Sequence, residues 1–254
     1  MSKNIRIIPT LHIKGPNVVK PVHTEALRVI GDPKKHAESY YHDGADELMY
    51  LDIVASLYLR NFDFDLLRSV SENIFIPITV GGGIRSLSDI KNALRVGADK
   101  IALNTFAVHH PEFLRAAARE FGSQCIVLYL EAKRKQEGGW EAYTDGGRES
   151  TGVDAVLWAK RAIELGVGEI LVTSIDCDGT RKGFDCELIR AIASCAPIPV
   201  IAHGGAGGAA DCLAAVHAGA DAVAASSIFH YREQSIGEVK KYLAERGVTV
   251  RRTA

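Results

Sequence analysis

The chain has 254 residues, of which 47% are hydrophobic and 24% are charged, so it can bury the core of one barrel-sized domain or of two smaller ones. Its 30 basic and 31 acidic residues nearly cancel, which argues against nucleic acid or a membrane surface as a bulk electrostatic partner. No run reaches the roughly 18 apolar residues of a membrane-spanning helix, and the opening residues lack a secretory pattern. We therefore expect a cytoplasmic protein.

Short β-branched runs alternate with amphipathic stretches along the whole chain. Eight of these runs are almost continuously apolar, as strands buried on both faces are, and they cover residues 5–13, 47–53, 76–80, 100–104, 125–132, 169–175, 198–202 and 221–226. Helical patterns lie between them, for example over 86–97 and 152–166. Eight such units suit the length of a (β/α)8 barrel. We therefore predict an α/β protein, a single TIM-barrel domain over residues 1–254.

An internal repeat relates the two halves of the chain. GADELMYL begins at Gly44 and GVGEILVT begins at Gly166, 122 residues later. The pairs IPITVGGG with IPVIAHGGA, and GADKIALNT with GADAVAASS, keep the same spacing. Three matches in one register predict two half-barrels, about 1–121 and 122–254. A doubly wound sheet is a distant alternative, because it is not expected to repeat as two equal halves.

Glycine clusters follow the third and seventh apolar runs, at equivalent positions of the repeat, and small polar residues follow the fourth and eighth. Glycine lets backbone N–H groups approach a phosphate, and the start of a helix favours an anion. Tight turns would explain one cluster, whereas two related clusters favour two phosphate sites and a small-molecule substrate with a phosphate at each end. The predicted phosphate and substrate residues are Lys20, Asp52, Gly82, Gly83, Asn104, Thr105, Asp178, Gly179, Gly204, Gly205, Ser226 and Ser227.

The first and fifth apolar runs are equivalent too. TLHIKG aligns with YLEAKR, which sets His12 against Glu131. The carboxyl ends of barrel strands carry catalytic residues, and a symmetric two-phosphate barrel needs its acid and base between the phosphates. Taken alone, His12 fits a satisfied core histidine equally well. Its equivalence to a carboxylate favours a functional position, and we predict His12 and Glu131 as the catalytic pair.

Taken together, LDIVAS, TVGGGI, GADKIALNT, EAKR, GEILVTSIDCDGT and GADAVAASSIFH resemble the cyclase subunit of imidazole glycerol phosphate synthase, and the resemblance spans nearly the whole chain. It implies ring closure on a ribonucleotide with a phosphate at each end. It also implies a heterodimer with a glutaminase subunit, which releases ammonia at the opposite, N-terminal face of the barrel. Ion pairs that serve stability alone are the plainer interpretation of the charges there. By resemblance the ammonia gate is Arg6, Glu47, Lys100 and Glu169, with Asp99 and Gln124 on the docking face.

The chain departs from this family at the residues that carry the chemistry. The family uses two aspartates as general acid and base where this chain has His12 and Glu131, and it usually has a serine at the position of His203. Glutamate reaches one methylene further and imidazole has another shape, while a misplacement of about 1 Å can cost on the order of 10²-fold in rate. We therefore expect the cyclase reaction of histidine biosynthesis to be weak or absent.

Several functions remain open. The favoured one is a paralogue similar to the cyclase-like subunits of surface-polysaccharide (lipopolysaccharide) synthesis, where ammonia passes to a third, amidotransferase-type protein that converts an N-acetyl sugar into an acetamidino sugar. The alternative is an authentic cyclase of histidine biosynthesis, which the phosphate elements support. A scaffold that only activates the glutaminase is a third possibility, and the isomerase that precedes the cyclase fits the gate residues less well. We expect no cofactor and no metal, and we interpret the five scattered cysteines as reduced thiols.

Overall fold

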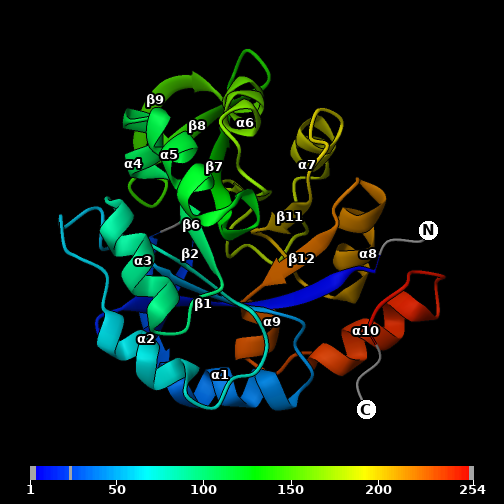
Figure 1. The fold of residues 1–254 in the computed structure, drawn as a ribbon. Helices are drawn as coiled ribbons and strands as arrows, with labels where there is room; N and C mark the ends of the chain where they lie inside the picture. Colours follow the sequence, from blue (N-terminus) through cyan, green and yellow to red (C-terminus); the bar gives the residue numbers. More distant parts are fainter. Residues whose placement is uncertain (1–3, 23–24, 252–254) are drawn as a thin grey trace.

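The computed structural model describes residues 4–22 and 25–251. Its central feature is a closed barrel of eight parallel strands (Figure 1). Neighbouring strands pair in chain order, β7 pairs with β10, and β12 pairs back with β1. Each apolar run predicted from the sequence overlaps one of these strands, so the predicted TIM barrel is confirmed. The strands are β1 (Arg6–Lys14), β4 (Leu48–Asp52), β5 (Ile78–Gly81), β6 (Lys100–Leu103), β7 (Ile126–Arg134), β10 (Glu169–Ser174), β11 (Val200–His203) and β12 (Ala222–Ala225).

Helices cover the outside of the barrel. They are α1 (Pro33–His42), α2 (Phe64–Ser71), α3 (Leu87–Arg95), α4 (Thr105–His109), α5 (Glu112–Phe121), α6 (Ala155–Glu164), α7 (Cys186–Ala193), α8 (Ala209–His217), α9 (Ser227–His230) and α10 (Ile236–Ala244), with a 3-10 turn at Ser123–Cys125. The pattern over 86–97 is α3, which Ser86 caps through the N–H of Asp89. The pattern over 152–166 starts later than predicted, because Asp154 accepts from two backbone N–H groups and begins α6 there. None of the helices in the described part of the chain is long and apolar enough to cross a membrane.

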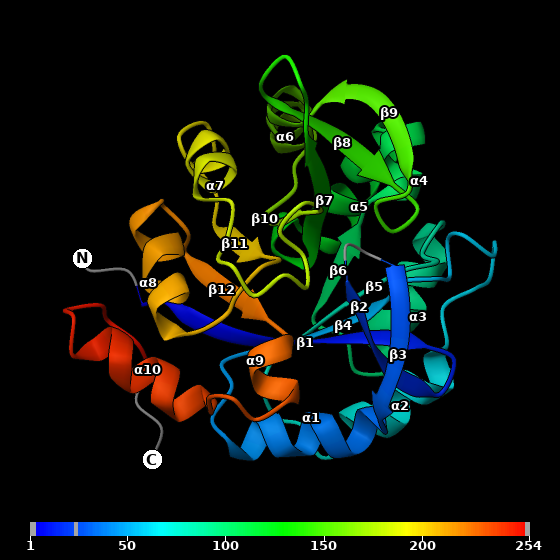
Figure 2. The same ribbon diagram turned by 180° about the vertical axis from the view of Figure 1, so that it is seen from behind.

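Two antiparallel hairpins extend the barrel beyond its eight strands, and the sequence analysis did not predict them. β2 (Asn17–Val22) pairs with the end of β1 and with β3 (Glu25–Gly31), while β8 (Trp140–Thr144) pairs with the end of β7 and with β9 (Glu149–Asp154). Figure 2 shows each hairpin as two strands side by side. Because His12 pairs with Val19 and Glu131 with Tyr143, the hairpins hold the two strand ends that carry the predicted catalytic pair.

The apolar core has two parts. The larger part lies between the barrel and its helices, and the smaller part fills the barrel with Ile8, Met49, Leu51, Ala102, Val127, Leu171, Ile201, Ala222 and Ala224. Ile7 belongs to the outer part and Ile8 to the inner part, as the alternation of side chains along a strand requires. Arg6, Thr10 and His12 share the inward face with Ile8. One face of β1 therefore runs through the barrel from its N-terminal end to its mouth.

Contacts recur between the halves at the spacing of the sequence repeat. The N–H of Ile78 donates to Asp99 over 2.8 Å, and the N–H of Val200 donates to Asp221 over 2.9 Å. Both aspartates precede the next strand by the same number of residues, so each fixes a loop at the N-terminal face. The division into half-barrels at about residue 121 stays a prediction.

Candidate active site at the barrel mouth

The predicted phosphate loops are tight turns at positions that only glycine can occupy. Gly82 has a φ of +97° and Gly205 a φ of +109°. A Cβ on Gly82 would lie 2.0 Å from the carbonyl oxygen of Asp52, and one on Gly205 would lie 2.2 Å from that of Gly183. Backbone packing alone therefore explains these glycines, and their role in phosphate binding stays a prediction.

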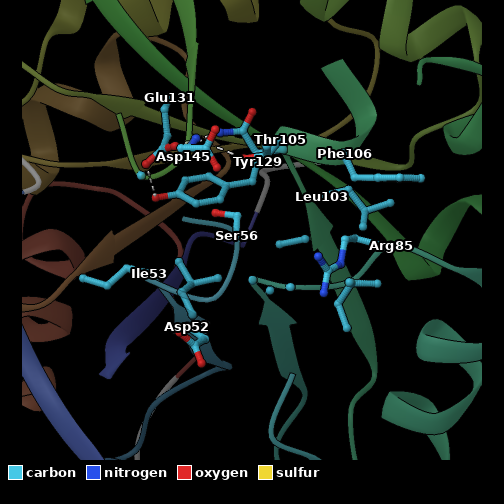
Figure 3. Close-up of a pocket in the computed structure, with 18 of the residues that line it drawn as sticks. Asp52, Ile53, Ser56, Arg85, Leu103, Thr105, Phe106, Tyr129, Glu131 and Asp145 are labelled. Carbon is cyan, nitrogen blue, oxygen red and sulfur yellow. Dashed lines mark hydrogen bonds between the residues drawn. The ribbon is translucent and has the colours of Figure 1, made fainter. Parts of the chain in front are cut away.

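The loops of the first half open onto a cavity of about 340 Å³ (Figure 3). Its wall brings together Asp52, Gly82, Gly83, Asn104, Thr105 and Glu131. Asp52 forms an ion pair of 2.7 Å with Arg60, and burial raises the pKa of Asp52 even though Arg60 acts against that rise. Thr105 accepts the N–H of Asp145 over 3.0 Å, and a hydroxyl group can also donate a hydrogen bond to a ligand.

The equivalent place in the second half is far smaller, with a volume of about 10 Å³. It gathers Lys20, Asp178, Gly179, Gly204, Gly205, Ser226 and Ser227, all predicted from the sequence, together with Arg181 and His203. Lys20 lies 3.9 Å from Asp178, and burial lowers its pKa from the ordinary value. The two predicted phosphate sites are thus unequal, and His203 lines the smaller one at the position that Gly81 holds in the first half.

Glu131 is buried and receives three hydrogen bonds. Asn104 donates to it over 2.7 Å, and the Tyr129 hydroxyl and the Gly147 N–H each donate over 3.1 Å. Figure 3 shows Tyr129 directed at Glu131 from the same strand. Burial raises the pKa of Glu131 to about 7 against the effect of these donors. At neutral pH this carboxyl is therefore divided between its charged and protonated forms, which suits a general acid or base.

His12 lies in the same central region and is only 2% exposed. Its Nδ1 has no hydrogen-bond partner within the described part of the chain. Burial, and then the nearby His203 and Lys20, lower the pKa of His12 well below its ordinary value. The ring of His203 meets that of His12 edge to face with 5.4 Å between centroids. His12 is therefore an uncharged imidazole at neutral pH, able to accept a proton.

The four predicted gate residues form a closed ring of ion pairs at the opposite end of the barrel. Arg6 contacts both Glu47, at 2.7 Å, and Glu169. Lys100 also contacts both glutamates, at 3.0 and 2.9 Å. Beside the ring, a depression of about 480 Å³ on this face includes Gln124. The structure thus brings the four residues together, and their role as a gate stays a prediction.

Some residues of the mouth were missed. Tyr129 precedes Glu131 by two positions on one strand, so strand alternation alone could have placed both on the inward face. Gly147 and Arg181 sit in loops and gave no such signal, because only folding brings them to the mouth. Among residues 4–22 and 25–251, no three His, Cys, Asp or Glu side chains are arranged to hold a metal ion.

Comparison with known proteins places this site in a family. A model of the family described as histidine biosynthesis protein matches residues 6–235. The chain is 50% identical over 257 residues to the imidazole glycerol phosphate synthase subunit HisF of Mycobacteroides abscessus, covering 99% of this chain and 100% of that protein. It is also 50% identical over 256 residues to the subunit of that name from Bifidobacterium adolescentis, with the same two coverages.

A third relative, the HisF subunit of Legionella pneumophila, is 56% identical over 204 residues, which cover 80% of this chain and 96% of that protein. All three are named as subunits of imidazole glycerol phosphate synthase, and none of the three is named for polysaccharide synthesis. These comparisons support the function that the sequence analysis placed second. They lend no support to the surface-polysaccharide function that it placed first.

Proposed function

The chain belongs to the histidine biosynthesis protein family, which includes subunits of imidazole glycerol phosphate synthase, and from this premise we propose that it is the ammonia-using subunit of such a synthase. In this proposal a glutaminase subunit docks on the N-terminal face, and its ammonia passes through the barrel. Ring closure then takes place at the mouth, on a ribonucleotide with a phosphate at each end. The observation that carries the proposal is the pairing of a charged ring at one end with glycine-lined cavities at the other.

The charged ring supports passage through the barrel more than it supports a purely structural role. Each of its cations contacts both glutamates, so the ring surrounds the barrel axis. Such pairs contribute little net stability, because the desolvation of both ions offsets their attraction. Above the ring, the hydroxyls of Thr10 and Thr79 are buried and have no hydrogen-bond partner within the described residues. Unused hydroxyls inside an apolar barrel suit the transit of a small polar molecule.

The mouth supports acid–base chemistry with His12 and Glu131 as the pair. Addition of ammonia to a carbonyl carbon requires a base that takes a proton from nitrogen and an acid that gives one to oxygen. His12 is uncharged and serves as the base, and the protonated fraction of Glu131 serves as the acid. Their opposite protonation states follow from burial acting on an imidazole and on a carboxyl, since burial favours the neutral form of each.

A second candidate function is delivery of ammonia to a third, amidotransferase-type protein that acts on a sugar in surface-polysaccharide synthesis. The observation that favours it is the small volume of the predicted phosphate site in the second half, which has about 10 Å³ of space beside His203. A phosphate ester needs far more room than one water-sized molecule, so a two-phosphate substrate requires this site to open. Delivery of ammonia needs no such opening.

The deciding experiment is turnover of the two-phosphate ribonucleotide with an excess of ammonium salt at mildly alkaline pH, which removes any need for a glutaminase. The wild-type chain is compared with a His12→Asp/Glu131→Asp variant, and with His217→Gln on α8 as a matched control outside the mouth. Wild-type turnover supports the first function. A silent wild type with activity recovered in the double variant supports the second. If neither the wild type nor the double variant turns over the ribonucleotide, and the wild type still stimulates a glutaminase, the chain acts only as a scaffold for that glutaminase.

A further inference from the structure

A third, small cavity of about 10 Å³ lies between the two predicted phosphate sites and shares lining residues with each of them. One water-sized molecule needs roughly 10–15 Å³ measured in this way, together with two to four polar partners. The lining supplies these partners from four barrel strands, β1, β7, β10 and β11, and from the loop after β10. Its polar residues are His12, Tyr129, Glu131, Thr173, Asp178 and His203. We refer to it as the His12–His203 cavity.

The two imidazoles of this cavity have unequal bonding. Nδ1 of His203 is paired with the Thr173 hydroxyl at 2.9 Å, which fixes the orientation of its ring. Nδ1 of His12 is buried without a partner among the described residues. An unpaired buried polar atom is destabilising, so a small ligand that forms a hydrogen bond with it removes that cost. The cavity is thus large enough for one small polar molecule, and Nδ1 of His12 is available to form a hydrogen bond with it.

The charge balance of the cavity favours a neutral occupant when Glu131 is protonated, as part of the population is at neutral pH. Both imidazoles are uncharged at neutral pH, since burial lowers the pKa of His203 to about 4 and that of His12 well below its ordinary value. Lys20 lies 3.9 Å from Asp178 and offsets the charge of that carboxylate. An ammonium ion therefore meets no uncompensated negative charge from Asp178. Uncharged ammonia can donate to Nδ1 of His12, to Nε2 of His203 in the tautomer whose Nδ1–H donates to Thr173, or to the Tyr129 oxygen.

The cavity also lies at the end of the path that begins at the charged ring. Arg6, Thr10 and His12 share the inward face of β1, with Arg6 in the ring and His12 in the cavity. The Thr10 hydroxyl between them is buried and unpartnered within the described residues. A molecule that crosses the barrel along this face reaches His12 first at the mouth.

We propose that the His12–His203 cavity is a holding site for one molecule of uncharged ammonia, bound by the two imidazoles next to Glu131 before it reacts. The identity of the occupant rests on the proposed function, which brings ammonia through the barrel. His203 is the distinguishing residue, because its repeat equivalent is Gly81 and the first half has no imidazole at that place. The barrel is thereby asymmetric, with its ammonia site on the second-half side of the mouth.

The test is a titration of the purified chain with ammonium chloride, followed through the NMR signals of the histidine rings. Spectra of His12→Gln and His203→Gln assign the two signals. We expect both to shift saturably, with a midpoint that stays constant between two pH values when it is expressed as free ammonia. Potassium chloride, whose cation is similar in size to ammonium, leaves both signals unchanged. The signal of His217 on α8 shifts with neither salt.

His203→Phe keeps a flat ring and removes its nitrogens, so we expect the affinity reported by His12 to fall roughly tenfold, the equivalent of one lost hydrogen bond. His203→Asn is the second variant, should the first not fold, and it retains part of the affinity. Shifts that follow total ammonium, or that appear equally with potassium, overturn the proposal, as does the absence of any saturable shift. The NMR titration does not depend on turnover. If ammonia binds but the chain does not close the ring on the ribonucleotide, the holding site is supported and only the proposed function is refuted.

Discussion

Asn104, which directly follows β6, donates a hydrogen bond of 2.7 Å to Oε2 of Glu131 near the end of β7, and its second amide proton goes to the carbonyl of Tyr143 at 3.0 Å. Both protons of this amide are therefore used within the protein. The sequence analysis expected Asn104 to bind phosphate. In the structure its side chain orients the carboxyl group that we propose as the acid, and phosphate binding at this position has to come from backbone N–H groups or from Thr105.

Removal of this amide should raise the pKa of Glu131. A donor to the charged form lowers a carboxyl pKa, so Asn104→Ala is expected to bring the pKa of Glu131 above its value of about 7. The measurement is a pH titration of the glutamate carboxyl signal by carbon NMR. Asn61→Ala serves as the control, because Asn61 accepts from Arg85 and does not contact Glu131, and it should leave that pKa unchanged. An unchanged pKa in Asn104→Ala would contradict this role.

The raised pKa of Glu131 also predicts how stability depends on pH. Between the ordinary value of 4.5 and the folded value of about 7, the folded chain binds more protons than the unfolded chain. The contribution of Glu131 to the free energy of unfolding is thus largest below pH 4.5 and is lost as pH rises through about 7. Glu131→Gln lacks this loss, so its stability relative to wild type should rise by roughly 3 kcal/mol across the window. Urea unfolding at several pH values measures the difference, and a constant difference would refute the assignment.

The charged ring predicts a stability cost when one of its cations is removed. Lys100→Met leaves Glu47 and Glu169 close together with only Arg6 between them, so we expect a loss of about 1–3 kcal/mol in the free energy of unfolding. The matched control is Lys34→Met, which breaks an exposed pair with Glu72 and should change little. Urea unfolding of the two variants gives the comparison. Equal losses would mean that the ring is no more coupled than a surface pair.

Gly82 and Gly138 separate close packing from backbone strain. Their φ values of +97° and +95° are nearly equal, but a Cβ on Gly82 meets the Asp52 carbonyl at 2.0 Å and one on Gly138 meets nothing within 4 Å. Gly138→Ala is therefore expected to cost about 1 kcal/mol from strain alone. Gly82→Ala adds a backbone clash and should cost about 3 kcal/mol or more. Thermal unfolding of both variants tests this, and similar losses would show that the loop after β5 can shift freely.

The sequence alone determined the barrel, its strand positions and the candidate residues of its mouth. Strands buried on both faces are continuously apolar, so runs such as 169–175 can be predicted without knowledge of the strands they pair with. The repeat then placed Gly82 against Gly204 and His12 against Glu131. The apolar runs are local in the chain, and the repeat depends only on the sequence distance between similar segments. For the same reason the short hairpin strands β2 and β8 escaped prediction, because their pairing depends on how far β1 and β7 extend past the barrel.

Only the tertiary structure decided what these residues do to one another. Closure of the barrel sets Asn104 on Glu131, turns the ring of His203 against that of His12, and joins Arg6 and Lys100 to the same two glutamates. None of these contacts is between neighbours in sequence. Their partners, their burial and the resulting pKa shifts depend on which strands become adjacent when all eight have paired, and that is a property of the whole fold.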